Sequence, residues 1–235
     1  MYKIGTKVRY SECGENGKMR LTSMINQFQD CTTEHSESLG AGIEHTREKR
    51  RAWILSSWQI VVERYPKVHD KIEISTWPTG FKGVLGPRNF CMKTPEGEML
   101  AYANTIWVYM NLETGMPTRP DEEEKSFYEI EPPLEMEYAS RKIKMPEEMK
   151  VVDTFSVRKY QIDTNSHMNN CQYVQMAVEV LPDDFEIHQV RVDYKKSAVF
   201  GDKIVVKEAM EEGRIVVELC DMEETSYAVV EFMGE

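Results

Sequence analysis

The sequence predicts an α+β fold made of two similar halves, each an apolar helix wrapped by an antiparallel sheet. The order of a helix followed by a run of strands occurs twice along the 235 residues. In addition, Asp70-Lys-Ile-Glu-Ile74 matches Asp202-Lys-Ile-Val-Val206 at a spacing of 132 residues. A repeat of this length indicates a duplicated domain rather than a solenoid. Hydrophobic residues make up 41% of the chain, enough to build a buried core.

The first half begins with a helix, expected over Leu21–Leu39. Met24, Ile25 and Phe28 follow the spacing of one helical face, and Gly40 provides a stop. Four segments rich in β-branched and aromatic residues come next, separated by turn formers such as Pro66 and Gly97, and are expected to be strands. They are Trp53–Val62, Lys71–Trp77, Arg88–Lys93 and Met99–Met110.

The second half repeats this order. A strand is expected over Phe155–Tyr160 and a helix over Gln172–Leu181. In this alignment of the two halves, Tyr173 is the equivalent of Phe28 in the first helix. Further strands are expected at Ile187–Tyr194, Lys203–Ala209, Ile215–Leu219 and Ser226–Phe232.

Residues 111–150 hold several prolines and an acidic run, and predict a surface linker without a role beyond connection. The predicted domains are therefore 1–110, the linker 111–150, and 151–235.

Composition excludes several classes of protein. The 29 basic and 40 acidic residues give a net charge of −11, which argues against a nucleic-acid partner. No apolar run is long enough to span a membrane, and the first residues do not resemble a signal peptide. The five cysteines lack the spacing of a disulfide framework or a zinc site. These features predict a soluble protein of the reducing cytosol.

One stretch carries candidate chemistry. Asp163, Asn165 and His167 alternate just before the second helix, so an extended backbone would place their side chains on one side. Asn169 and Asn170 are suited to cap that helix, whose free N–H groups form a positive pole. A carboxylate, an amide and an imidazole near such donors can position water and stabilise an oxyanion. The same residue types also serve as plain caps and turn formers, and the spacing leaves both interpretations open.

The run Asp163-x-Asn-x-His-Met-Asn-Asn-x-x-Tyr173 resembles the acyl-acyl-carrier-protein (acyl-ACP) thioesterases of plants and bacteria. So do Asn26–Asp30 with Thr33–His35, and the segment from Trp53 to Pro66. The resemblance implies a tandem hotdog fold, in which each of two central helices is wrapped by a curved antiparallel sheet. It also implies hydrolysis of the thioester between a fatty acyl chain and the phosphopantetheine arm of acyl carrier protein, which ends chain elongation.

The family's catalytic residues correspond to three residues of the motif. His167 would orient or deprotonate the attacking water, because imidazole exchanges a proton near neutral pH. Asn165 would bind the thioester carbonyl or the water. Asp163 would fix the imidazole tautomer or act as the base. Water is the nucleophile, so neither a metal nor an organic cofactor is expected.

The chain departs from the family at one place. Plant members have Tyr-Arg-Arg-Glu-Cys in a downstream strand, where this chain reads Tyr194-Lys-Lys-Ser-Ala198. Ser197 stands in place of the acidic residue and Ala198 in place of a cysteine once considered a nucleophile. Ser197 could hold a water molecule, but an unassisted serine is a poor base. Cys171 follows His167 in the helix, where packing is the more common role of a cysteine.

The resemblance also implies an acyl pocket and a docking site for the acidic carrier. Met24, Phe28 and Trp58 could line the pocket, or could simply be core residues. The basic cluster Arg47, Lys49, Arg50 and Arg51 could dock acyl carrier protein by charge, or could be a solvated turn.

The leading interpretation is a cytosolic acyl-ACP hydrolase without membrane insertion. One alternative is an acyl-CoA thioesterase, which would need a phosphate pocket instead of a broad basic surface. The other is a non-catalytic acyl-binding or sensor protein, favoured by Ser197 but opposed by the retention of Asp163, Asn165 and His167. Oligomeric state is left open, with a homodimer among the options.

Overall fold

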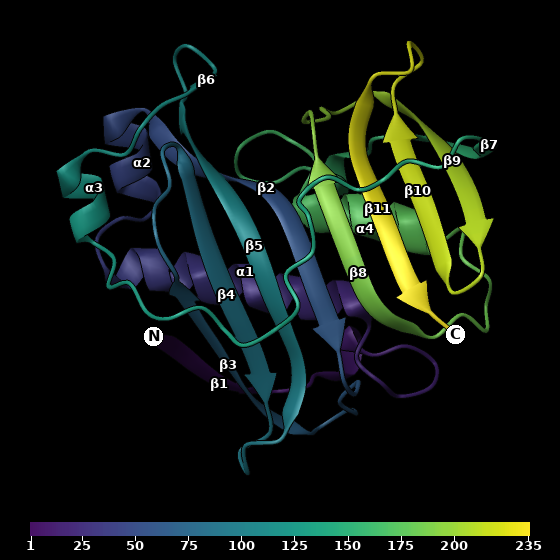
Figure 1. Ribbon diagram of the computed structural model, residues 1–235, viewed down its shortest axis with the longest axis horizontal. Coiled ribbons are helices and arrows are strands. Elements are labelled where there is room, and N and C mark those ends of the chain that lie inside the picture. The colour runs from purple at the N-terminus through teal and green to yellow at the C-terminus, as the bar shows by residue number, and fades with distance from the viewer. The chain divides into compact units, whose positions relative to one another are not determined.

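A computed structural model describes residues 1–235 as two compact units (Figure 1). The first contains Met1–Ser56 and Ile60–Tyr138, and the second contains Ser57–Gln59 and Ala139–Glu235. Each unit holds one helix with a buried apolar face and an antiparallel sheet, so the predicted α+β architecture is confirmed. None of the helices combines the length and the apolar composition needed to cross a bilayer.

The first unit is built around helix α1, Leu21–Ser38. Its sheet has the order β1-β3-β4-β5-β2, with a short β6 paired to β5. Met24, Ile25 and Phe28 are fully buried, and each such side chain contributes about 1.5–3 kcal/mol to stability. The strands are β1 Tyr2–Lys7, β2 Arg51–Val62, β3 Lys71–Pro78, β4 Leu85–Lys93, β5 Met99–Asn111 and β6 Met116–Pro117, and the short helices are α2 Ile43–Lys49 and α3 Glu122–Ser126.

The second unit has the same plan on a shorter helix, α4, Asn170–Val178. Its sheet has the order β7-β9-β10-β11-β8, which matches β1-β3-β4-β5-β2 strand for strand. The strands are β7 Lys150–Ser156, β8 Ile187–Tyr194, β9 Lys203–Glu211, β10 Arg214–Cys220 and β11 Ser226–Gly234.

Backbone hydrogen bonds confirm the duplication residue by residue. Val8 N donates to Asp70 O at 2.9 Å, and Val157 N donates to Asp202 O at 2.9 Å, which preserves the spacing of 132 between Asp70 and Asp202. The predicted pairing of Phe28 with Tyr173 is wrong. Each helix follows a turn closed by a β-bridge, Cys13↔Met19 in the first unit and Ile162↔Met168 in the second. Aligning these turns makes Met24 the equivalent of Tyr173, and Met24 lies one helical turn before Phe28.

Several elements differ from their predictions at the edges of the sheets. β1 and α2 were not expected, because β1 is a half-exposed edge strand and α2 lies in a basic run without an apolar face. The strand predicted at Phe155–Tyr160 is wrong in its second part: β7 ends at Ser156, and a 3-10 turn occupies Lys159–Gln161. Helix α4 begins two residues early because the Asn169 side chain accepts a hydrogen bond from Cys171 N at 2.9 Å.

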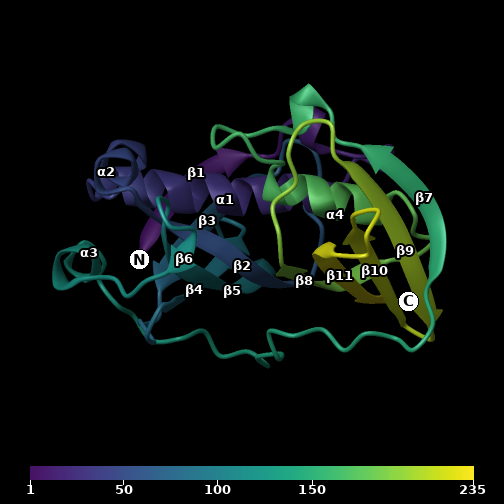
Figure 2. The same cartoon turned by 90° about the horizontal axis from the view of Figure 1, so that it is seen from above.

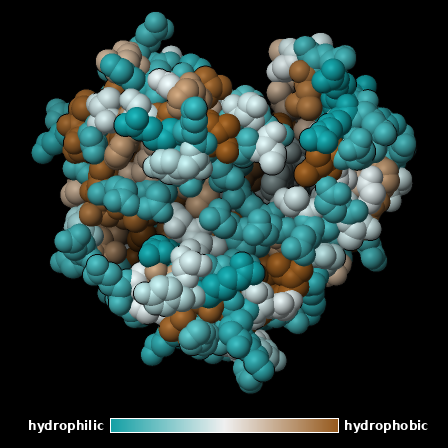
Figure 3. All heavy atoms as spheres, turned by 180° about the vertical axis from the view of Figure 1, so that it is seen from behind, coloured by the Kyte–Doolittle hydropathy of each residue, from teal (hydrophilic) through white to brown (hydrophobic).

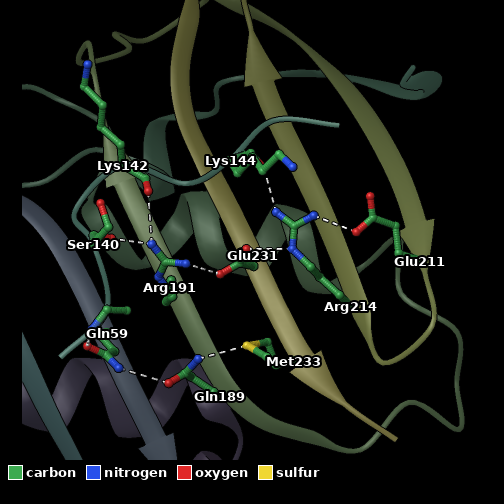
Figure 4. Close-up of polar contacts among 11 residues, drawn as sticks. Gln59, Ser140, Lys142, Lys144, Gln189, Arg191, Glu211, Arg214, Glu231 and Met233 are labelled. Atoms are coloured by element: carbon green, nitrogen blue, oxygen red, sulfur yellow. Dashed lines mark hydrogen bonds and ion pairs between the residues drawn. The ribbon is translucent and has the colours of Figure 1, made fainter. Parts of the chain in front are cut away.

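The linker is more than a plain connection. It contains α3, and in the second unit it runs along the face of the sheet away from α4 (Figure 2). In the second unit, Arg191 donates to the carbonyls of Ser140 and Lys142, and Arg214 donates to that of Lys144 (Figure 4). These bonds fasten the linker to the outer face of the sheet.

Candidate functional site

The motif before α4 folds as a closed turn, not as the extended segment that alternation predicts. Asp163 N donates to His167 O at 2.8 Å, and Ser166 has a φ of 63°. The cause is the Asp163 side chain, which accepts from Asn165 N at 2.8 Å and from His167 N at 3.4 Å. An aspartate that bonds to the backbone beyond it favours a turn over a strand.

This turn separates the roles of the three side chains. The half-buried Asp163 carboxylate is engaged by its own loop, and no hydrogen bond joins it to the His167 imidazole. Asn165 and His167 are exposed, and their side chains make no hydrogen bond or ion pair within the chain. The arrangement holds an amide and an imidazole on a fixed turn, where they can reach a molecule from solvent.

The segment that carries Ser197 is held beside the turn through its neighbour. Ala198 O accepts from Met168 N at 2.8 Å, and Ala198 N donates to the Tyr173 hydroxyl oxygen at 2.8 Å. Ser197 itself is exposed and has no hydrogen-bond partner in the chain. Burial raises the pKa of Tyr173 to about 12, so its hydroxyl stays protonated at neutral pH. The sequence places Tyr173 in the motif and on the helix, but it does not predict that the Tyr173 hydroxyl holds the segment of Ser197.

Helix α4 presents its N-terminus to the same region. The Tyr194 hydroxyl donates to Asn170 O at 2.9 Å, which fixes the first turn of the helix against β8. Cys171 in this turn is buried, and burial raises the pKa of its thiol to about 12. A thiol that is protonated at neutral pH is a poor nucleophile.

The first unit has the same turn without the same chemistry. Its bridge Cys13↔Met19 encloses Gly14, Asn16 and Lys18 at the places of Asp163, Asn165 and His167. Here Lys18 N donates to the Asn16 side chain at 2.9 Å. The backbone of the turn is therefore duplicated, whereas the carboxylate and the imidazole are present in the second unit alone. Across the chain, no three His, Cys, Asp or Glu side chains come together as metal ligands would.

The residues predicted to line an acyl pocket are all buried. Met24 and Phe28 lie in the first unit, where the Phe28 ring centroid is 5.3 Å from that of Phe90, and Trp58 lies on β2. These three side chains line neither of two surface cavities of about 540 and 360 Å³. Their burial suits a core role as well as a pocket role, so the pocket stays a prediction.

The basic cluster is largely neutralised by acidic neighbours. Arg47 lies 3.7 Å from Glu44, Lys49 lies 2.6 Å from Glu123, and Arg51 lies 3.4 Å from Asp121. Of the four, only Arg50 has no acidic partner. Asp121 and Glu123 belong to the acidic run of residues 111–150, which the sequence predicts to be a plain surface linker.

That acidic run is anchored by one of its own members. Glu124 is buried and accepts from Trp53 Nε1 at 2.8 Å and from the Tyr109 hydroxyl at 3.2 Å, and lies 3.1 Å from His45 Nε2. This contact holds α3 next to α2.

Comparison with known proteins identifies the family. The family model of the acyl-ACP thioesterase N-terminal domain matches residues 1–128 of the sequence, and the family model of the C-terminal domain matches residues 144–231. A chloroplastic palmitoyl-acyl carrier protein thioesterase of Gossypium hirsutum is 27% identical over 80% of this chain and 50% of its own length. A chloroplastic oleoyl-acyl carrier protein thioesterase of Arabidopsis thaliana is 25% identical over 86% of this chain and 62% of its own. The chain thus spans about half to three-fifths of these relatives.

Solved structures agree on the fold. An acyl-ACP thioesterase of Bacteroides thetaiotaomicron has a TM-score of 0.90 at 22% identity, covering 99% of this chain and 97% of its own. The 12:0-ACP thioesterase of Umbellularia californica has a TM-score of 0.89 at 19% identity, covering 100% and 96%. The predicted tandem hotdog fold is therefore confirmed. Because the two domain models together match most of the sequence in the expected order, this chain belongs to the acyl-ACP thioesterase family.

Proposed function

We propose that this protein hydrolyses fatty acyl-ACP and releases the free fatty acid, which terminates chain elongation. The observation that carries this proposal is the Asp163–His167 turn, which presents Asn165 and His167 to solvent next to the N-terminus of α4. The turn lies within the part of the chain that matches the family's C-terminal domain.

The proposed reaction uses water as the nucleophile. His167 takes a proton from the water molecule while the water oxygen bonds to the thioester carbon. Asn165 donates a hydrogen bond to the carbonyl oxygen, where negative charge develops. The C–S bond then breaks, and the proton held by His167 passes to the departing phosphopantetheine sulfur. Asp163 acts as a positioning residue, because its carboxylate holds the turn on which the other two side chains sit.

Two further parts of the proposal concern the substrate. Met24, Phe28 and Trp58 would line the space that takes the acyl chain. Arg47, Lys49, Arg50 and Arg51 would attract the acidic carrier. Their ion pairs with Glu44, Asp121 and Glu123 reduce the charge available for this second role.

The test is a release assay with acyl-ACPs and acyl-CoAs of graded chain length. The proposal predicts turnover with acyl-ACP at a kcat/KM well above that for the matching acyl-CoA. Faster turnover of acyl-CoA would support an acyl-CoA thioesterase instead. Tight acyl binding without release from either carrier would support a non-catalytic sensor.

A further inference from the structure

Two exposed loops lie side by side next to the candidate turn. Val157 N donates to Asp202 O at 2.9 Å, and Gly201 N donates to Val157 O at 3.1 Å. These bonds place residues 158–160 against residues 199–203. The second loop directly follows Ala198, whose carbonyl accepts from Met168 N in the motif. The two loops therefore form one surface that borders Asn165 and His167.

The centre of this surface is apolar and exposed. Tyr160 is 81% exposed, Phe200 57% and Val199 43%. Single exposed apolar residues are ordinary, but large apolar side chains gathered beside a candidate site indicate an interaction surface. On the face seen from behind, hydrophobic residues form separate groups among hydrophilic ones (Figure 3).

Cations surround this apolar centre. Arg158, Lys159 and Lys203 are exposed, and none has an acidic partner. Lys159 Nζ lies 5.7 Å from the centroid of the Phe200 ring. The acid of the loop, Asp202, is engaged by Val199 N at 3.0 Å and by the Tyr227 hydroxyl at 3.1 Å. Unpaired positive charge is thus concentrated here on a chain whose net charge is −11.

We propose that this surface, formed by residues 158–160, 199, 200 and 203 and called here the turn-side surface, is where acyl carrier protein docks. The inference rests on the proposed function and extends it, because it places the contact with the carrier beside the candidate turn, whereas the largely ion-paired Arg47–Arg51 cluster would only attract the carrier. An apolar centre with a charged rim is the usual composition of a protein interface. Unpaired cations complement an acidic carrier and accelerate its encounter with the enzyme. Docking here also brings the phosphopantetheine arm to the edge of the candidate turn.

The chain offers a matched control for the apolar centre. Tyr10 lies on the corresponding 3-10 turn of the first unit and is 86% exposed. The test variants are Tyr160→Ser with Phe200→Ser, and separately Lys159→Glu with Lys203→Glu. The control is Tyr10→Ser. Kinetics are measured with acyl-ACP and with acyl-pantetheine, which carries the same thioester without the carrier.

The proposal predicts that both test variants raise KM for acyl-ACP about tenfold or more, the size expected for losing one interface anchor. The kcat/KM for acyl-pantetheine should stay within about twofold, and Tyr10→Ser should leave both substrates unchanged. Loss of kcat/KM with both substrates, or an equal effect of Tyr10→Ser, would overturn the assignment.

Direct binding separates this inference from the proposed function. Fluorescence anisotropy of labelled acyl-ACP reads docking even if the wild type releases no fatty acid. Weaker binding by the test variants, with Tyr10→Ser unchanged, supports the turn-side surface under either outcome of the release assay. Unchanged binding would overturn it. The assignment would also be overturned if the test variants lost binding to anionic lipid vesicles but kept binding to acyl-ACP, because the surface would then bind a membrane.

Discussion

At the scale of single residues, Ser197 stands where plant members of the family have an acidic residue, and its side chain forms no hydrogen bond or ion pair within the chain. Its hydroxyl has no partner, and its position is set by the two hydrogen bonds of Ala198 to Met168 and Tyr173. Because a hydroxyl can orient water without removing its proton, Ser197→Ala should reduce kcat/KM for acyl-ACP by about tenfold at most. A loss as large as that of His167→Ala would instead make Ser197 a primary member of the site.

His35 makes the stability of the protein depend on pH. It lies on α1 and is 8% exposed. Its ring stacks on Tyr2 and lies near Tyr128 and the N-terminal amino group. Its Nδ1 accepts a hydrogen bond from Arg88 Nη1 at 3.0 Å. Burial, and then the charge of Arg88, lower the pKa of His35 to about 4. The unfolded chain therefore binds a proton near pH 6.5 that the folded chain does not bind until about pH 4.

Stability linked to His35 is present above pH 6.5 and is lost as the pH falls toward 4, by at most about 3 kcal/mol. Urea unfolding at pH 7 and pH 5 should show this loss in the wild type and a smaller one in His35→Gln. The exposed His188 offers a control, because His188→Gln should keep the wild-type dependence. Equal pH dependence in all three proteins would contradict this account of His35.

At the scale of elements, the linker is fastened through one buried carboxylate. Glu231 on β11 is 3% exposed and accepts from Arg191 Nη1 at 2.6 Å and from Arg214 Nε at 2.8 Å. The same two arginines hold the carbonyls of alternate linker residues (Figure 4). Between these bonds, Ile143 packs on Val216 and Val229.

Removing this carboxylate should therefore release the linker. Glu231→Ala leaves both arginines without their shared partner and should cost about 3–5 kcal/mol of unfolding free energy. It should also make residues 139–149 sensitive to limited proteolysis, read by mass spectrometry. Glu211, which pairs with Arg214 at 2.8 Å, is half-exposed at its side chain, so Glu211→Ala should cost no more than about 1 kcal/mol. Equal cleavage in both variants would show that Glu231 does not fasten the linker.

The elements differ in how well the sequence predicts them, for physical reasons. Strands with strong β-branched patterns, such as Ile187–Tyr194, have the predicted bounds. The helix α3 is stabilised by Asp121, which accepts from Glu124 N at 2.9 Å, and by tertiary contacts of Glu124. Only Glu124 of this acidic run is buried, and because its contacts are distant in sequence, the run resembles a solvated linker until those contacts are known.

At the scale of the whole molecule, duplication supplies the framework and divergence supplies the site. Both units have the same strand order and the same closed turn before the helix, yet Gly14 and Lys18 occupy the places of Asp163 and His167. The sequence predicts which three residues belong together in the motif. It does not predict that Asp163 closes the turn, because alternation in a sequence does not reveal a side chain that bonds to its own backbone.

The most direct test of the central claim compares the two turns in one acyl-ACP release assay. His167→Ala should reduce kcat about 10²-fold or more, as expected for loss of a general base, with the unfolding free energy unchanged. Lys18→Ala alters the corresponding position of the first unit and should leave kcat close to the wild type. A folded His167→Ala enzyme with wild-type turnover, or an equal loss in Lys18→Ala, would contradict the assignment of hydrolysis to the turn of the second unit.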